Sequence, residues 1–180
     1  MDRAHWDAAY ASGDEGTSWY EATPEASLRM IDRAGLAPGR VIDAGGGASA
    51  LAGHLRRSGW DVTVLDISPV ALDLGQRRAG EAAAQIDWVA ADITRWRAST
   101  PFDLWHDRAV FHFLIAAEDR IAYAQSLRTA LRPGGAAVIA SFAEDGPGRC
   151  SGLPTVRYAP EALLAALGPG LRLESAERLS

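Results

Sequence analysis

The chain has 180 residues, of which 48% are hydrophobic and 23% charged, so it suits one domain, residues 1–180, with a core of its own. Its net charge of −5 and pI of about 5.3 argue against a basic face for nucleic acid. The lone cysteine, Cys150, excludes an internal disulfide, and neither a signal pattern nor an apolar run of about 20 residues is present, so we expect a cytoplasmic protein.

The first 35 residues predict an aromatic cap segment ahead of the main fold. Aromatic and small residues crowd positions 5–21. The stretch Pro24–Ala34 predicts a helix, because Thr23 can cap it, proline suits its first turn and Gly35 ends it. The main fold is expected over residues 36–180.

In that region short apolar strands alternate with helices. The expected strands are Arg40–Asp43, Asp61–Asp66, Ile86–Ala91, Leu104–His106, Ala136–Phe142 and Leu171–Leu179. The expected helices are Ala50–Ser58, Pro69–Ala79, Asp119–Leu131 and Pro160–Leu167. Strands this apolar are usually covered on both faces, and regular alternation with helices predicts a doubly wound, mostly parallel α/β sheet.

Three consecutive glycines, Gly45, Gly46 and Gly47, follow the first strand directly. Glycine removes the side chains that would keep a ligand away from the backbone, and the helix start behind the turn leaves N–H groups unpaired. The turn can therefore approach a nucleotide-like ligand closely, with the charge of Asp43 beside it. By spacing alone, Gly45, Gly47 and Ala50 also fit a dinucleotide-binding pattern, so the glycines leave the choice of cofactor open.

An acid stands at or near the end of each of the first four strands: Asp43, Asp66, Asp92 and Asp107. Ligands of open α/β sheets bind beyond the carboxyl ends of the strands, so we expect these acids to meet at one rim. Asp66 lies about 20 residues after the glycines, where an acid commonly bonds ribose hydroxyls. Asp92 would face an adenine, and Asp43 a cation or amino group. A ligand with a ribose, an adenine and positive charge suits this rim better than a pyrophosphate does.

Together these features resemble the class I S-adenosylmethionine-dependent methyltransferases. The glycine motif is Asp43–Ser49, with Ser49 where a third spaced glycine is usual, and the ribose acid stands in Leu65–Ser68. The stretch Phe102–Leu114 is similar to the family's fourth-strand motif, and Leu131–Gly135 to the turn before its fifth strand. The resemblance implies a Rossmann-like fold with helices on both faces of the sheet. It implies cofactor contacts at Tyr20, Asp43, Gly45, Gly46, Gly47, Ser49, Asp66, Ile67, Asp92, Ile93 and Asp107.

The reaction implied by the resemblance moves a methyl group from S-adenosylmethionine to an acceptor, leaves S-adenosylhomocysteine and needs no metal. Because the sulfonium is already activated, the protein chiefly has to align acceptor, methyl and sulfur. A base is needed only for a protonated acceptor, and His112 is the first candidate, Asp107 the second. Weaker candidates for contact with the acceptor are Trp19, His106, Arg108 and Cys150.

The acceptor is expected to be a small molecule. No large substrate domain is inserted, so the N-terminal aromatic segment and the 144–158 loop must roof the pocket. Neither a nucleic acid nor a membrane is expected as a partner, and the chain would be a monomer or a homodimer. The family usually closes its sheet with a hairpin of the sixth and seventh strands. Here we expect the seventh strand to be missing, which leaves a sheet edge open to pairing.

Three alternatives remain open. A lysine of a protein acceptor is suggested by the stretch His5–Tyr20, which loosely resembles the elongation-factor lysine methyltransferases. A non-catalytic S-adenosylmethionine-binding module is suggested by the short C-terminus. An NAD-linked oxidoreductase is disfavoured by Asp43 and by the lack of a Ser/Tyr/Lys set for hydride transfer.

Overall fold

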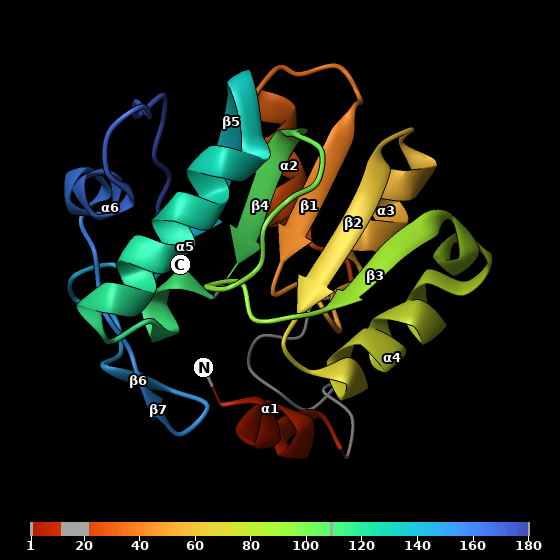
Figure 1. Cartoon of the computed structure of the whole chain (residues 1–180), viewed down its shortest axis with the longest axis horizontal. Helices are drawn as coiled ribbons and strands as arrows, with labels where there is room; N and C mark the ends of the chain where they lie inside the picture. The colour runs from red at the N-terminus through yellow and green to blue at the C-terminus, as the bar shows by residue number, and fades with distance from the viewer. Residues whose placement is uncertain (1, 12–21, 109, 180) are drawn as a thin grey trace.

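The fold is built around one parallel sheet. The computed structural model describes residues 2–11, 22–108 and 110–179. Its sheet has the strand order β3-β2-β1-β4-β5, and every neighbouring pair is parallel (Figure 1). The strands are β1 (Arg40–Ala44), β2 (Asp61–Asp66), β3 (Ile86–Ala90), β4 (Phe102–Arg108) and β5 (Leu131–Ala140). The order reverses beside β1, so the chain winds outward in both directions and the predicted doubly wound sheet is confirmed.

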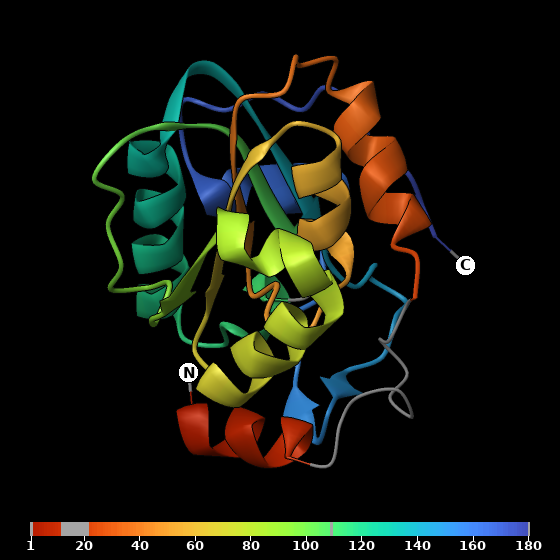
Figure 2. The ribbon, with the colours of Figure 1, turned by 90° about the vertical axis from the view of Figure 1, so that its right-hand side faces the viewer.

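Helices cover both faces of the sheet, as Figure 2 shows. On one face, α2 (Glu25–Arg33), α3 (Leu51–Arg57) and α4 (Pro69–Ala79) pack with buried strand residues such as Val41, Val62 and Leu104. On the other face, α5 (Ala117–Ala130) and α6 (Pro160–Leu167) pack on a second apolar cluster that includes Ile42 and Trp105. Neighbouring strand residues thus face opposite layers, as the pleat requires.

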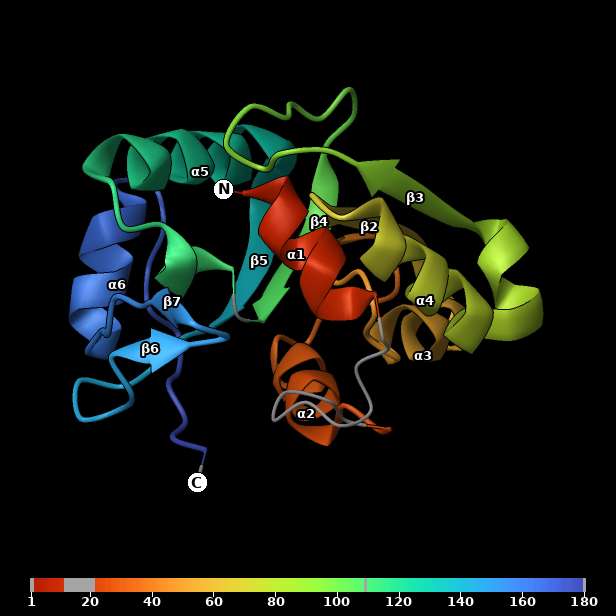
Figure 3. The same cartoon turned by 90° about the horizontal axis from the view of Figure 1, so that it is seen from below.

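Two elements lie beyond the carboxyl ends of the strands (Figure 3). One is α1 (Arg3–Tyr10), whose first turn is capped by Asp2, with the carboxylate accepting from the N–H of Ala4 at 2.9 Å. The other is a hairpin of β6 (Arg149–Cys150) and β7 (Leu153–Pro154). The sequence predicts an aromatic cap and a long loop here, and the structure gives each of them a regular element.

Two short 3₁₀ helices complete the described elements: η1 (Gly80–Gln85) before β3 and η2 (Phe111–Phe113) after β4. The expected turn over 131–135 is instead the first half of β5. The partner of Phe102 is Leu131 and the partner of Leu104 is Ala136, so the extra residues form an irregularity in the strand. None of the described helices is long and apolar enough to cross a membrane.

The strand predicted over 171–179 is wrong. No residue of this stretch is in a strand, and all but residue 171 are exposed. Its charged residues pair with other side chains, Glu177 with Arg29 at 2.6 Å and with Arg33 at 3.2 Å, both on α2. The alternation of leucine with charged residues imitates a half-buried strand, but no described strand offers this segment backbone pairing.

Candidate active site

A pocket lies at the carboxyl ends of β1, β2 and β4, and residues of the glycine turn, of α1 and of the β6–β7 hairpin line it. Figure 3 shows α1 and the hairpin at this end of the sheet. Strand ends supply its acids, Asp43 and Asp66. Trp6 and Tyr10 of α1 and Cys150 of the hairpin form further walls. The N-terminal segment and the 144–158 loop thus both reach the pocket, as the sequence predicts.

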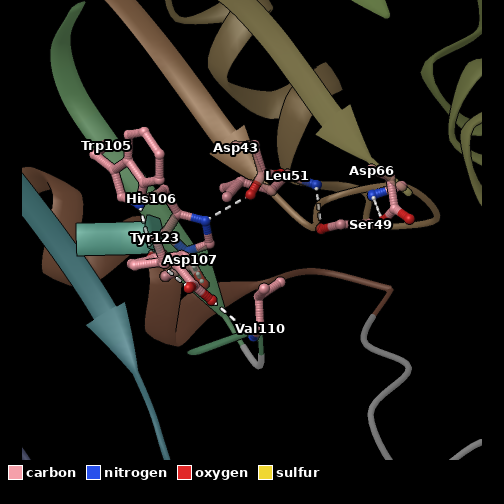
Figure 4. A network of polar contacts seen from close by, with 11 residues as sticks. Asp43, Ser49, Leu51, Asp66, Trp105, His106, Asp107, Val110 and Tyr123 are labelled. Atoms are coloured by element: carbon pink, nitrogen blue, oxygen red, sulfur yellow. Dashed lines mark hydrogen bonds and ion pairs between the residues drawn. The ribbon is translucent and has the colours of Figure 1, made fainter. Parts of the chain in front are cut away.

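The floor of the pocket is a hydrogen-bonded set from three elements. Asp43 of β1 and His106 of β4 are register partners, so their side chains share the face that carries α2. Nδ1 of His106 lies 2.7 Å from Oδ1 of Asp43, and Nε2 of the same ring lies 3.0 Å from Oγ of Ser27 in α2 (Figure 4 shows the first contact). All three side chains are buried. A carboxylate only accepts, so Nδ1 donates to Asp43.

The second carboxylate oxygen of Asp43 indicates where a ligand could bind. Oδ2 is buried and has no hydrogen-bond partner among the described residues. A Cβ added to Gly46 would lie 2.2 Å from this oxygen, so glycine at this position leaves room for the Asp43 carboxylate against the backbone of the turn. A buried polar atom without a partner costs free energy, and a donor from outside the chain would remove that cost.

The glycine turn brings the chain from β1 to α3. Gly45 has φ +74, in the left-handed region, and its N–H donates to the carbonyl of Leu65 at 2.6 Å. Ser49 accepts a hydrogen bond from the N–H of Leu51 at 3.0 Å, at the start of α3. The cap position of α3 is Ala50, which makes no side-chain cap hydrogen bond, so Ser49 stands one residue before the cap.

Asp66 stands at the end of β2 and holds the turn from both sides. Its carboxylate accepts from the N–H of Gly47 at 3.1 Å and from the N–H of Ser68 at 2.8 Å. Burial raises the pKa of this carboxyl to about 6, although these backbone donors act in the opposite direction. Asp66 is consequently fixed in orientation and ionised at neutral pH.

Asp107 lies on the other face of the sheet, because it follows His106 in β4. Its carboxylate accepts from the N–H of Val110 at 2.8 Å, the N–H of Phe111 at 3.2 Å and the hydroxyl of Tyr123 (Figure 4). Burial raises its pKa to about 6. Asp107 does not line the pocket. In this position it stabilises the turn after β4.

His112 and Asp92 also lie outside the pocket lining. The His112 ring is buried between Phe113 and Phe142, at centroid distances of 4.3 and 4.7 Å, and neither ring nitrogen has a partner among the described residues. Burial lowers its pKa to about 4. Asp92 accepts from the N–H of Thr94 at 2.9 Å and from its hydroxyl at 2.7 Å, and so holds its own loop.

Comparison with known proteins identifies the family to which the chain belongs. Residues 41–135 match the family model described as methyltransferase domain, which is more than half of the chain. The chain belongs to this family. The resemblance to class I S-adenosylmethionine-dependent methyltransferases is thereby confirmed, and the methyl donor of the family is S-adenosylmethionine.

Relatives of this methyltransferase domain act on different molecules. The malonyl-[acyl-carrier protein] O-methyltransferase of Enterobacter lignolyticus is 36% identical over 126 residues, 69% of this chain and 45% of that protein. The demethylmenaquinone methyltransferase of Renibacterium salmoninarum is 33% identical over 117 residues, 63% of this chain and 46% of that protein. The chain thus spans about half the length of these curated relatives.

Two solved structures share the fold over most of the chain. One was described for the conversion of a disulfide bond into a thioacetal group during echinomycin biosynthesis, with a TM-score of 0.75, 26% identity and coverage of 96% of this chain and 80% of that one. The other is the Burkholderia thailandensis 1,6-didemethyltoxoflavin-N1-methyltransferase with bound 1,6-didemethyltoxoflavin and S-adenosylhomocysteine, with a TM-score of 0.71, 26% identity and coverage of 91% of this chain and 75% of that one.

The residues of the pocket fit such a methyl donor. Oδ2 of Asp43, which has no partner among the described residues, suits an amino group, and Gly45 and Gly46 bring backbone without side chains to the pocket wall. Among the described residues, no three His, Cys, Asp or Glu side chains are grouped to hold a metal ion. Of the residues predicted from sequence, the pocket brings together Asp43, Gly45, Gly46, Ser49, Asp66, Ile67, Ile93, His106, Arg108 and Cys150.

Other predicted residues are not among the pocket lining or lie outside the described residues. Gly47 contributes its N–H to Asp66 but does not line the pocket itself. Tyr20 and Trp19 lie outside the described residues. Sequence reasoning missed Ser27, Trp6, Tyr10 and Phe113. The aromatic density of the N-terminus pointed to the right segment, whereas nothing in the sequence marks Ser27 as the partner of His106.

Proposed function

We propose that this domain transfers the methyl group of S-adenosylmethionine to a small-molecule acceptor. One observation carries the proposal: Asp43, whose Oδ2 has no partner among the described residues, lines the same pocket as Trp6, Phe113 and Cys150. A donor that is held at the strand ends would therefore meet an acceptor under the cover of α1 and the hairpin. Two reactants held in one closed pocket react with greatly reduced entropic cost.

The donor would be held by backbone and acids together. Asp43 would accept from the amino group through Oδ2, and Asp66 would accept from the ribose hydroxyls with the lone pairs that Gly47 and Ser68 leave free. Ala91 and Ile93 would form the apolar walls of the adenine site, since they line the pocket and Asp92 does not.

The acceptor would lie between Trp6, Phe113, Arg108 and the hairpin. S-adenosylmethionine supplies a methyl group that is already activated by its sulfonium. The chain then has to orient the acceptor and exclude water, and Trp6 packs edge-on against Phe113 with centroids 5.0 Å apart to close one side. Asp107 and His112 would need to move into the pocket to act as bases, so we assign the acceptor no general base.

The test is turnover: formation of S-adenosylhomocysteine in the presence of a panel of phenols, quinones, thiols, amines and carboxylates. At least one small acceptor should be methylated, and the variant Asp43→Asn should lose activity. Control assays use Asp92→Asn, which removes a carboxylate outside the pocket lining.

The other outcomes decide between the alternatives. Methylation of a lysine-rich protein without any small acceptor would favour a protein methyltransferase. Tight binding of S-adenosylmethionine without turnover on either panel would favour the non-catalytic module. Preference for NADH over S-adenosylmethionine would contradict the proposal altogether.

A further inference from the structure

The side chains of Ser27, His106 and Asp43 are hydrogen-bonded in a row and buried, and Oδ2 of Asp43 at the end of the row has no partner among the described residues. The three side chains are 5%, 3% and 1% exposed, and they come from α2, β4 and β1. Nδ1–H of His106 donates to Oδ1 of Asp43 at 2.7 Å, and Nε2 of the same ring is hydrogen-bonded to Oγ of Ser27 at 3.0 Å. Of the polar side-chain atoms of these three residues, Oδ2 of Asp43 is the one that has no hydrogen-bond partner among the described residues.

This arrangement fixes the rotation of the carboxylate. A carboxylate bonded through one oxygen to a ring that is itself held at its far nitrogen has one orientation. A Cβ on Gly46 would lie 2.2 Å from Oδ2 and 2.3 Å from Cγ of Asp43, so glycine at this position leaves room for the carboxylate in this orientation. Asp43 and Gly46 both line the pocket, and Oδ2 is the carboxylate oxygen that His106 does not hold, so it is the oxygen left for a donor from a bound ligand.

We propose that His106 and Ser27 are positioning residues, which aim Oδ2 of Asp43 at the amino group of the bound cofactor. The inference rests on the proposed function, because it requires a ligand with an S-adenosylmethionine-like amino end. It gives α2 a role in the site: Ser27 connects a helix that precedes the sheet in sequence to the acid of the glycine motif. His106 acts through Asp43 and not on the acceptor.

The binding of two ligands can distinguish a positioning role of His106 from a general role in the stability of the fold. S-adenosylhomocysteine carries the amino-acid end, whereas 5′-methylthioadenosine has the same nucleoside and sulfur but lacks it. Both should bind the wild-type chain in calorimetric titration. The variant His106→Leu should weaken S-adenosylhomocysteine by about 10- to 100-fold, the range for a charge-assisted hydrogen bond, and leave methylthioadenosine unchanged.

Conservative variants keep the test valid if His106→Leu does not fold. In His106→Asn the amide nitrogen takes the place of Nδ1 and can still donate to Asp43, so the affinity for S-adenosylhomocysteine should largely return. Ser27→Ala should give a smaller loss of the same ligand selectivity. His54→Leu, the same change on α3 outside the pocket lining, serves as the control and should alter neither affinity.

The outcomes are distinct. Equal weakening of both ligands in the His106 variants, or no change in either, would overturn the positioning role while leaving the proposed function intact. Failure of the wild-type chain to bind either ligand would overturn the proposed function and this inference with it.

Discussion

The acids of the strand ends differ in role because neighbouring residues of a strand face opposite layers. Asp43 and His106 share the α2 face and line the pocket, whereas Asp107, one residue on, reaches Tyr123 of α5. Motif spacing along the chain places all of them at one rim. Which face each occupies follows from the register of β1 and β4, which the sequence alone does not state.

The protonation of Asp66 predicts that the affinity for the cofactor falls at acid pH; this fall is called the acid limb. Burial raises its pKa to about 6, and only the ionised carboxylate accepts from two ribose hydroxyls. Affinity for S-adenosylhomocysteine should therefore fall as pH drops below about 6, by up to about tenfold per pH unit. Titrations from pH 7.5 to 5 measure it. The limb should persist in Asp92→Asn and be absent in Asp66→Asn; an unchanged limb in Asp66→Asn would refute the assignment.

We expect that replacement of the buried His112 increases the free energy of unfolding at acid pH. Burial lowers its pKa to about 4, so between pH 6.5 and 4 the unfolded chain binds a proton that the folded chain does not, and stability falls as pH falls. His112→Phe removes this penalty and should stabilise the fold at pH 5 by about 2 kcal/mol. Urea denaturation at pH 5 and pH 7.5 checks it.

The same variant tests the base that the sequence predicts at His112. Since the ring does not line the pocket, His112→Phe should keep methyl transfer near the wild-type rate. Loss of turnover by a hundredfold or more in a folded His112→Phe chain would establish a catalytic role instead.

At the scale of elements, α1 is the cover of the pocket. Its Asp7 accepts from the hydroxyl of Ser68 at 2.7 Å, and Ser68 also caps α4. Trp6 lines the pocket from the same helix. Trp6→Ala should weaken S-adenosylhomocysteine about tenfold, because it removes apolar surface from the ligand, with little change in melting temperature. Arg3→Gln, on the exposed side of α1, is the control; equal losses would mean that Trp6 acts only through the fold.

The β6–β7 hairpin carries the only thiol of the chain into the pocket wall. Because Cys150 is the sole cysteine, alkylation with iodoacetamide reports on this wall alone. Saturating S-adenosylhomocysteine should slow the labelling severalfold, since a ligand in the pocket restricts access to it. A labelling rate that is independent of the ligand would place the hairpin away from the bound cofactor.

Over the whole molecule, the sequence predicts what depends on local pattern. The alternation of strand and helix, the glycine turn and the doubly wound sheet follow from periodicity and turn chemistry, and the structure confirms them. Where the structure differs from the sequence analysis or adds to it, the causes are non-local. Residues 171–179 alternate like a strand but lack a partner among the described residues, and Asp107 and Ser27 take their roles from α5 and from β4. α1 is capped by Asp2 and held by Ser68, 61 residues away.

The most direct test of the account is calorimetric titration of the full chain with S-adenosylmethionine and S-adenosylhomocysteine, in wild type, Gly46→Ala and Gly148→Ala. A Cβ at Gly46 would lie 2.2 Å from Oδ2 of Asp43, whereas a Cβ at Gly148 meets nothing within 4 Å. Wild type and Gly148→Ala should bind both ligands, and Gly46→Ala, whose Cβ would displace the buried Asp43 carboxylate and lower the melting temperature, should bind neither at a temperature at which it is still folded. Unimpaired binding by Gly46→Ala, or none by the wild type, would contradict the assignment of this pocket to the methyl donor.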